Sequence, residues 1–314
     1  MEVIRGLINI KDHHKGSVVT VGNFDGVHTG HKKILDQMKV KARELGAPTM
    51  LICFEPLPRE FFDFYNAPAR LTRFREKVEL LDQLGIDIVM CLKFDKVMKE
   101  IAADRFIEIL AKDLGVKAVY IGDDFRFGQN RSGDFSLLEA AGREYGFEVN
   151  AFETVTHEEV RVSSTRIREC LQAGDFSLAE KLLGHPYFIA GKVVYGRQVG
   201  RTLDVPTINV QLHRYVAPIA GVYACETEID GVTYKGVANV GVRPTFEEEL
   251  PKPVLEVHLF DFSRDVYGTN VKVIFRHKLR DEQKFDGVES LRAAIHRDID
   301  AARAYFADQS DKAE

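Results

Sequence analysis

Two hydrophobic periodicities alternate along the first half of the chain. Short apolar and β-branched runs predict buried strands at residues 17–21, 50–54, 87–92, 118–121 and 147–151. Between these runs, apolar residues recur at helical spacing at residues 34–45, 74–84, 106–114 and 137–145. In the second of these helices, Val78, Leu81 and Leu84 are expected to face inward. Strands that alternate with helices form right-handed βαβ units, so the pattern predicts an α/β domain with a mostly parallel sheet and flanking helices.

The pattern changes after residue 163. Two short helical segments end near Gly184, and from His185 onward Val, Ile, Tyr and Thr alternate with polar residues between recurrent glycines. Asp230-Gly231, between two such runs, is a strong hairpin signal. A small antiparallel β-barrel fits this half, followed by a helix whose apolar stripe is Val288, Leu291, Ile295, Ile299, Ala302 and Phe306. We therefore expect an α/β domain over residues 1–184 and a barrel domain over residues 185–314.

Composition narrows the class of protein. A length of 314 residues fits two domains of ordinary size. The net charge of −5 and the pI near 6.1 argue against a general nucleic-acid or membrane-surface binder. No apolar run is long enough to span a bilayer, and the first residues lack the apolar core of a signal peptide. We expect a cytoplasmic protein that acts on small molecules, with no nucleic-acid, membrane or obligatory protein partner.

The segment Gly22-Asn23-Phe24-Asp25-Gly26-Val27-His28-Thr29-Gly30-His31 lies where the first predicted strand turns into a helix. Glycine lets the backbone approach a ligand, and a helix N-terminus presents unpaired N–H groups to an anion. Histidines three residues apart on a first turn point the same way, towards whatever the turn holds. An ordinary strand–helix turn, with one histidine as a cap and the other at the surface, is the alternative. The two histidines beside the glycines favour a bound triphosphate.

Other polar residues follow neighbouring predicted strands. Glu55-Pro56 comes directly after the run at 50–54, and Gly122-Asp123-Asp124 after the run at 118–121. In parallel α/β sheets, ligands lie beyond the carboxyl ends of the strands. We therefore expect these segments to converge with His28 and His31 on one site.

A second segment, residues 161–168, complements the histidine turn. Cleavage of an α–β phosphoanhydride requires charge neutralisation and in-line positioning more than covalent chemistry. Ser163, Ser164 and Thr165 stand at a predicted helix start, where their hydroxyls can bind phosphate oxygens. Arg161 and Arg168 can hold the leaving pyrophosphate. A plain helix cap is the usual role of such hydroxyls, but beside the histidine turn nucleotidyl transfer is favoured.

Gly22–His31 and Ser163–Arg168 resemble the two signatures of the nucleotidylyltransferase superfamily, the first shared loosely with class I aminoacyl-tRNA synthetases. With residues 123–128, the first half resembles the Rossmann-like FMN adenylyltransferase domain of the bacterial bifunctional riboflavin kinase/FAD synthetase family. The resemblance implies catalytic and ATP-binding roles for His28, His31, Arg161, Ser164, Thr165 and Arg168. It implies nucleotide or flavin contacts for Gly22, Asn23, Phe24, Gly30, Asp124 and Ser163. It also implies a loop with Phe54, Phe61 and Phe62 that holds the isoalloxazine, although bare phenylalanines more often belong to a core.

The barrel half contains no Gly-x-x-x-x-Gly-Lys-Ser/Thr segment, so general motifs predict no kinase there. Pro206 fixes the backbone before Thr207 and Asn209, which alternate onto one face and offer two oxygen ligands. Mg²⁺ takes few protein ligands and completes its shell with water and phosphates. Glu256 and His258 share one strand face, and the carboxylate could accept a proton from an attacking hydroxyl. Taken alone, such residues on a barrel are usually solvated.

Residues 206–209 resemble the Pro-Thr-x-Asn motif of the riboflavin kinase domain of the same family. The resemblance implies that Thr207 and Asn209 hold Mg²⁺–ATP and that Glu256 activates the ribityl 5′-hydroxyl of riboflavin. It implies further substrate contacts for Gly200, Arg201, Pro206, Arg243 and Arg280. The whole chain would then convert riboflavin to FMN and FMN to FAD with ATP and Mg²⁺.

One residue departs from the family pattern. The family has glycine where this chain has Asp204, and although aspartate tolerates left-handed backbone, its carboxylate would repel a nearby phosphate. We expect both activities, with the kinase weakened. The alternatives are an adenylyltransferase whose barrel only binds flavin, a non-catalytic flavin or nucleotide sensor, and a cytidylyltransferase or pantetheine-phosphate adenylyltransferase. The long second domain does not fit the last of these.

Overall fold

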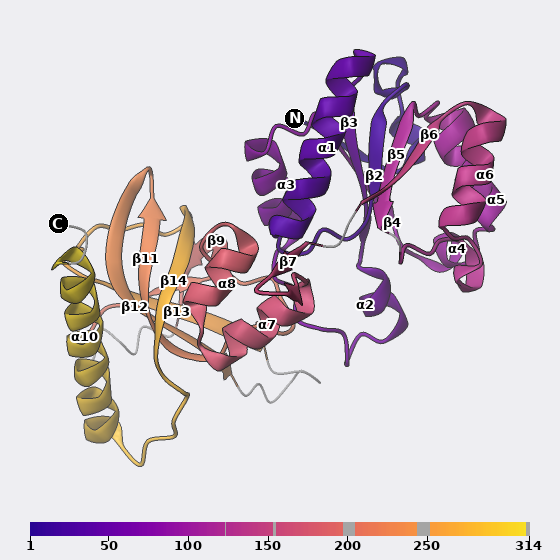
Figure 1. The fold of residues 1–314 in the computed structure, drawn as a ribbon. Helices are drawn as coiled ribbons and strands as arrows, with labels where there is room; N and C mark the ends of the chain where they lie inside the picture. Colours follow the sequence, from indigo (N-terminus) through magenta and orange to yellow (C-terminus); the bar gives the residue numbers. More distant parts are fainter. Residues whose placement is uncertain (123, 153–154, 197–204, 244–251, 312–314) are drawn as a thin grey trace. The chain divides into compact units, whose positions relative to one another are not determined.

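The computed structural model describes residues 1–122, 124–152, 155–196, 205–243 and 252–311 (Figure 1). Its contacts divide the chain into two compact units, Met1–Pro68 with Phe74–Ser163, and Ala69–Arg73 with Ser164–Glu314. Residues 164–184 thus group with the barrel by contacts. The sequence-based boundary after residue 184 stays a prediction.

The first unit is built on a six-stranded sheet whose strands are all parallel, in the order β1-β4-β3-β2-β5-β6. The strands are β1 (Glu2–Arg5), β2 (Val18–Val21), β3 (Thr49–Glu55), β4 (Ile88–Lys93), β5 (Ala118–Gly122) and β6 (Glu148–Phe152). Every residue of β2 is buried, as expected for a parallel strand covered on both faces. The predicted α/β architecture of this half is confirmed.

Helices flank this sheet (Figure 1). They are α1 (Thr29–Leu45), α2 (Pro58–Phe62), α3 (Phe74–Gln83), α4 (Lys96–Lys99), α5 (Ala103–Glu108), the π-helical turn η3 (Ile109–Asp113) and α6 (Phe135–Tyr145). Three 3₁₀ turns and a two-residue hairpin complete the unit: η1 (Leu7–Asn9), η2 (Asp12–His14), η4 (Gln129–Arg131), β7 (Thr156–His157) and β8 (Val160–Arg161). In α3 the buried face holds Glu76, Lys77, Leu80 and Leu81, with Val78 and Leu84 half-buried. Leu81 is thus buried as predicted, Val78 and Leu84 are buried only in part, and the buried face extends to two charged residues, Glu76 and Lys77.

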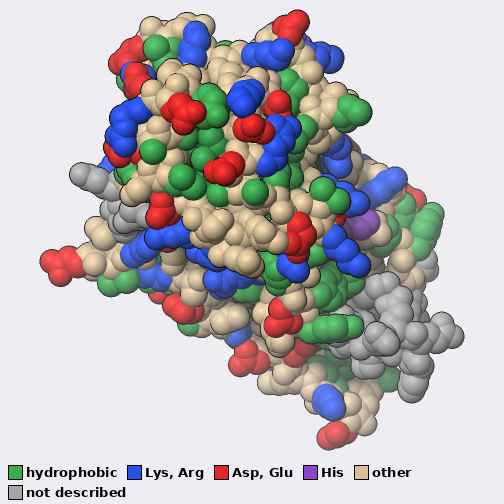
Figure 2. All heavy atoms as spheres, turned by 90° about the vertical axis from the view of Figure 1, so that its right-hand side faces the viewer, with side chains coloured by type: hydrophobic (Ala, Val, Ile, Leu, Met, Phe, Trp, Pro, Cys, Tyr) green, Lys and Arg blue, Asp and Glu red, His purple; other side chains and the backbone are tan. Residues whose placement is uncertain are grey.

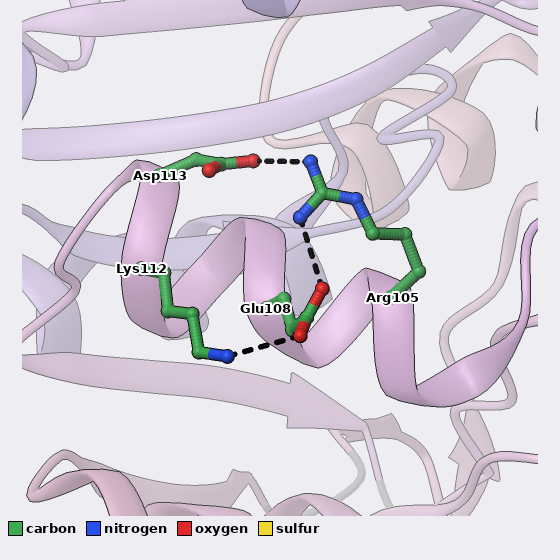
Figure 3. A network of polar contacts seen from close by, with 4 residues as sticks. All are labelled: Arg105, Glu108, Lys112 and Asp113. Atoms are coloured by element: carbon green, nitrogen blue, oxygen red, sulfur yellow. Dashed lines mark hydrogen bonds and ion pairs between the residues drawn. The ribbon is translucent and has the colours of Figure 1, made fainter.

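Charged side chains hold the outer surface of α5 and η3 together (Figure 3). Arg105 contacts Glu108 at 3.1 Å and Asp113 at 2.9 Å, and Lys112 contacts Glu108 at 3.0 Å. These pairs are partly exposed, so each contributes little to stability. They lie on the solvent side of the segment, opposite the core residues Phe106, Ile107 and Leu110.

The second unit is a closed antiparallel barrel in the order β10-β13-β12-β11-β14-β9. Its strands are β9 (Phe188–Val194), β10 (Ile208–Val210), β11 (Gly221–Ile229), β12 (Val232–Arg243), β13 (Lys252–Leu259) and β14 (Asn270–Arg280). Helices α7 (Ser164–Ala173) and α8 (Phe176–Leu183) precede the barrel, and α10 (Val288–Asp311) follows it. The predicted hairpin is confirmed, with positive φ at both turn residues, 50° at Asp230 and 81° at Gly231.

Helix α10 packs on the barrel through Ala302 and Phe306, which join a core cluster with Val222 and Ala224. Val288, expected on the apolar stripe, is 64% exposed because it opens the helix directly after an exposed loop. The buried stripe instead includes the carboxylate of Asp298. Asp298 lines the same cavity as the predicted kinase residues Thr207 and Glu256.

The surface carries both signs of charge. On the face shown in Figure 2, basic and acidic side chains are interspersed over the molecule. Among the described residues, no helix combines the length and apolarity needed to cross a bilayer. All four cysteines are free and buried.

Candidate active sites

The histidine turn connects β2 to α1 and is held by its own side chains. His28 is the N-cap of α1, and its Nδ1 accepts a hydrogen bond from the backbone N–H of His31 at 3.3 Å. The two imidazole rings stack with centroids 3.6 Å apart. Because Nδ1 is the acceptor, the neutral His28 ring carries its hydrogen on Nε2. That N–H is the group that His28 can offer to a phosphate oxygen.

Both imidazoles are held in the neutral form. Burial lowers the pKa of His28 to about 4; the carboxylate of Asp25 opposes this shift, and the charge of Arg161 adds to it. Burial lowers the pKa of His31 well below its ordinary value, and the charges of His28 and Lys77 lower it further. Nδ1 of His31 is buried and has no hydrogen-bond partner among the described residues. The turn therefore presents neutral hydrogen-bonding groups near pH 7.

The backbone before His28 adopts left-handed conformations that side chains rarely tolerate. Phe24, Gly26 and Val27 have φ values of 47°, 85° and 42°. Such a value is unfavourable for a β-branched residue such as Val27, and strained backbone of this kind concentrates at functional sites. The buried Phe24 ring stacks against His31, with centroids 4.4 Å apart. His31 is therefore held between two rings.

Two glycines of the motif leave room for these rings. A Cβ at position 22 would lie 3.1 Å from the Phe24 ring, and one at position 30 would lie 3.1 Å from both Cε1 and Nδ1 of His28. Neither glycine has a positive φ, so close packing explains them rather than backbone freedom. Asn23, also predicted to contact substrate, is exposed beside them.

A charged pair lies at the same end of the sheet. Arg161, on β8, approaches Asp124, directly after β5, with Nη2 3.3 Å from Oδ2. Both side chains are more than half exposed, so the pair is easily exchanged for contacts to a ligand. Because Arg161 also shifts the pKa of His28, the structure brings Arg161, Asp124 and the histidine turn together, as predicted.

The predicted hydroxyl segment spans the two units. Ser163 ends the first unit, and Ser164 opens α7 in the second, followed by the exposed Thr165. Nε of Arg168 donates to the carbonyl of Ala69 at 2.6 Å. The joint action of Ser164, Thr165 and Arg168 with His28 stays a prediction.

The predicted aromatic residues form a cluster with a member that the sequence analysis missed. Phe61 and Phe62 contact the ring of Phe94 edge-on, with centroids 5.4 Å and 5.8 Å away, and Phe54 does so at 5.8 Å. Phe54 belongs to β3 and the other two to α2, so the expected loop is in fact a strand end followed by a short helix. Phe62 is 62% exposed. Phe94 follows β4 directly, a position that the strand-end rule could have identified.

Lys77 is a second residue that sequence reasoning missed. It lies on α3 with only 1% of its surface exposed, and its charge lowers the pKa of His31. A lysine at this position of an amphipathic helix is normally expected to face solvent. No sequence signal distinguished it.

The barrel site surrounds a cavity of about 260 Å³. Thr207, Glu256, His258 and Arg280 line it together, which confirms that Glu256 and His258 share one face of β13. Asn209, predicted on the same face as Thr207, lines a different cavity. In the ladder, Glu256 pairs with Asn209 on β10 and with Asn239 on β12. Glu256 is half-buried, and of its two ladder partners only Asn239, which was not predicted, lines the same cavity.

Arg280, predicted to contact substrate, is anchored by α10. Its guanidinium binds Asp298 through Nε at 2.9 Å and Nη2 at 2.8 Å, and it lies over the ring of Phe285 at 5.5 Å. Arg280, Asp298 and Phe285 all line the cavity. The arginine therefore presents a fixed face to this site.

Several residues that the sequence analysis assigned to the barrel site lie outside the described part of the chain. Gly200, Arg201 and Asp204 lie outside the described residues, as does the side chain of Arg243 at the end of β12. Pro206 is described and exposed, directly before β10.

Comparisons with known proteins agree with the two sites. A family model described as FAD synthetase matches residues 10–166, and one described as riboflavin kinase matches residues 183–306. A bifunctional riboflavin kinase/FMN adenylyltransferase of Pseudomonas fluorescens is 47% identical over 98% of each chain. The protein of the same name from Escherichia coli K12 is 46% identical, also over 98% of each chain.

A solved structure has the same fold. It is described as a macrolide-efflux protein from Streptococcus pneumoniae, and it matches with a TM-score of 0.80 and 29% identity over 96% of this chain and 99% of that one. The transport activity in its name belongs to that protein and carries no argument for this chain.

Proposed function

The chain belongs to the bifunctional riboflavin kinase/FMN adenylyltransferase family, and on that premise we propose that it carries out both reactions. The barrel unit transfers the γ-phosphoryl group of ATP to riboflavin and forms FMN. The first unit transfers the adenylyl group of a second ATP to FMN and forms FAD and pyrophosphate. Near-identical length and 46–47% identity to relatives of that name support both activities over the alternative of a flavin-binding barrel without catalysis.

In the adenylyl transfer, a phosphate oxygen of FMN attacks the α-phosphorus of ATP. The new P–O bond forms as the α–β anhydride bond breaks, and pyrophosphate leaves with its charge. We assign the Nε2–H of His28 to a hydrogen bond with a phosphate oxygen, because Nδ1 is engaged by the backbone. His31 and Arg161 of the first unit belong to the same anion site in this proposal. The roles of Ser164, Thr165 and Arg168 rest on the family resemblance alone. Such groups lower the barrier by stabilising charge that develops on the leaving group.

In the phosphoryl transfer, Glu256 accepts the proton of the ribityl 5′-hydroxyl as its oxygen attacks the γ-phosphorus of ATP. The β–γ anhydride bond breaks as the new P–O bond forms, and ADP leaves. The carboxylate suits this task because Glu256 is half-buried and lines the cavity together with Asn239, its ladder partner on β12. Arg280, fixed by Asp298, is assigned to the flavin side of the cavity. The apolar lining from Val222, Val237 and Ile299 suits an aromatic ring system.

The donor set of the barrel site fits Mg²⁺. The hydroxyl of Thr207 and the side-chain oxygens of Asn209 and Glu256 are hard oxygen donors, the kind that Mg²⁺ prefers. Thr207 and Asn209 would hold the ion, which when bound neutralises phosphate charge. We further propose that the protein works in the cytoplasm on small-molecule substrates, without an obligatory protein, nucleic-acid or membrane partner.

The observation that carries the two-site proposal is that His28 and Glu256 belong to separate compact units. The test follows products from riboflavin, ATP and Mg²⁺ by chromatography, with FMN expected first and FAD later. His28→Ala should abolish FAD formation and leave FMN formation intact. Glu256→Gln should abolish FMN formation and leave FAD formation from added FMN intact. Equal loss of both activities in either variant would contradict the proposal.

A further inference from the structure

His258 makes one contact that fixes its protonation pattern. Its Nδ1 lies 2.9 Å from the backbone carbonyl oxygen of Pro206. A carbonyl oxygen only accepts hydrogen bonds, so Nδ1 must be the donor. The neutral ring therefore carries its hydrogen on Nδ1 and a lone pair on Nε2. This hydrogen bond joins β13 to the Pro-Thr-x-Asn segment, 52 residues away in the chain.

The hydrogen bond from His258 to Pro206 lies just beyond the end of the pairing between β10 and β13. The described pairing of β10 with β13 begins at Ile208 opposite Val257 and continues to Val210 opposite Leu255. Pro206 has no N–H to give to a ladder, and Thr207 lies before the first pair. The carbonyl that His258 holds belongs to the peptide unit between Pro206 and Thr207. The side chain of His258 thus supplies an attachment that the backbone does not.

This attachment bears directly on Thr207. Fixing the plane of the Pro206–Thr207 peptide unit restricts the backbone on the N-terminal side of Thr207, and therefore the direction of its side chain. Thr207, Glu256 and His258 line the same cavity. A change in the orientation of Thr207 would displace a group proposed to bind Mg²⁺–ATP. The position of Glu256 would change less, because its backbone is paired with strands on both sides.

We propose that His258 is a positioning residue of the kinase site, whose Nδ1–H sets the orientation of Thr207 through the carbonyl of Pro206. The proposal rests on the proposed kinase function of the barrel. It assigns His258 no contact with substrate and no proton transfer.

The test uses amides that imitate one ring nitrogen each. In His258→Asn the side-chain N–H can occupy the place of Nδ1, whereas in His258→Gln it occupies the place of Nε2. Riboflavin phosphorylation is measured in the full chain at varied ATP and at varied riboflavin. We expect His258→Gln and His258→Ala to raise the KM for ATP about fivefold, the effect of one hydrogen bond, with kcat and the KM for riboflavin little changed. His258→Asn should stay within about twofold of the parent.

Two controls separate this role from general damage. FAD formation from FMN, an activity of the other unit, should be equal in all variants, and His296→Asn, an exposed change on α10, should leave both activities unchanged. Nitrogen-15 NMR of the labelled parent protein should show the hydrogen of His258 on Nδ1. Equal KM values for the Asn and Gln variants, a matching fall in kcat, or a hydrogen on Nε2 would overturn the inference. Absence of FMN formation by the parent protein would instead overturn the proposed kinase function.

Discussion

Nδ1 of His28 accepts a hydrogen bond from the backbone N–H of His31 at 3.3 Å, and the two rings stack 3.6 Å apart. One residue is therefore both the cap of α1 and a proposed catalytic group. The cap uses Nδ1 and the chemistry uses Nε2, so the two roles can be separated by substitution.

His28→Asn should keep the cap and lose the chemistry. The side-chain oxygen of asparagine replaces Nδ1 as an acceptor, and asparagine is among the best N-caps, whereas alanine provides no acceptor. We expect His28→Ala to lower the free energy of unfolding of the first unit by about 1 kcal/mol, and His28→Asn to lower it much less. Both should lose FAD formation. Urea unfolding and FAD assays measure the two effects. Substantial FAD formation by the Asn variant would argue against the Nε2–H assignment.

The low pKa of His28 predicts a dependence of stability on pH. The pKa is about 4 in the folded protein and has an ordinary value of 6.5, so between these values the unfolded chain binds more protons. The stabilisation from the neutral ring is therefore complete above pH 6.5 and is lost as the pH falls towards 4. From about pH 7.5 to about pH 5 this term should fall by about 2 kcal/mol. His28→Asn removes the titrating group and serves as the reference. The prediction would be contradicted if the difference in unfolding free energy between the parent and the His28→Asn variant did not vary with pH.

Gly30→Ala should disturb the site without disturbing the helix. A Cβ at position 30 would lie 3.1 Å from two atoms of the His28 ring, and alanine is otherwise favourable in a helix. We expect FAD formation to fall about tenfold or more, because a small displacement of a catalytic group is costly, with FMN formation unchanged. Gln37→Ala, exposed on the same helix, is the matched control. Unchanged FAD formation in Gly30→Ala would mean that the ring of His28 can move without loss.

Local patterns were sufficient for much of this architecture. Period-two alternation places Glu256 and His258 on one face of their strand, and the structure puts both around one cavity. The strand–glycine–helix pattern likewise located the histidine turn. These features depend on neighbours within a few residues, which the sequence displays directly.

Features that depend on distant pairings could not be obtained in this way. Asn239 meets Glu256 only through the register of β12 against β13, which no local signal specifies. Lys77 is buried on the same face of α3 as Leu80 and Leu81, a position that hydrophobicity alone assigns to an apolar residue. Asp298 lies on the apolar stripe of α10, and the reason for a carboxylate there is its hydrogen bond with Arg280 of β14.

Asp298→Asn should weaken the barrel unit and its kinase activity together. Asp298 is 7% exposed and binds the guanidinium of Arg280 at 2.8 Å and 2.9 Å, so the neutral amide leaves a cation partly buried without its counter-charge. Loss of a buried ion-pair partner costs several kcal/mol, and since Arg280 is partly exposed we expect about 2 kcal/mol in the free energy of unfolding. Arg280 lines the cavity, so the KM for riboflavin should rise while FAD formation from FMN is retained. Asp300→Asn changes an exposed carboxylate of the same helix and should have neither effect. Equal stability and equal KM for riboflavin in the two variants would show that the Arg280–Asp298 pair neither secures α10 nor shapes the flavin side of the site.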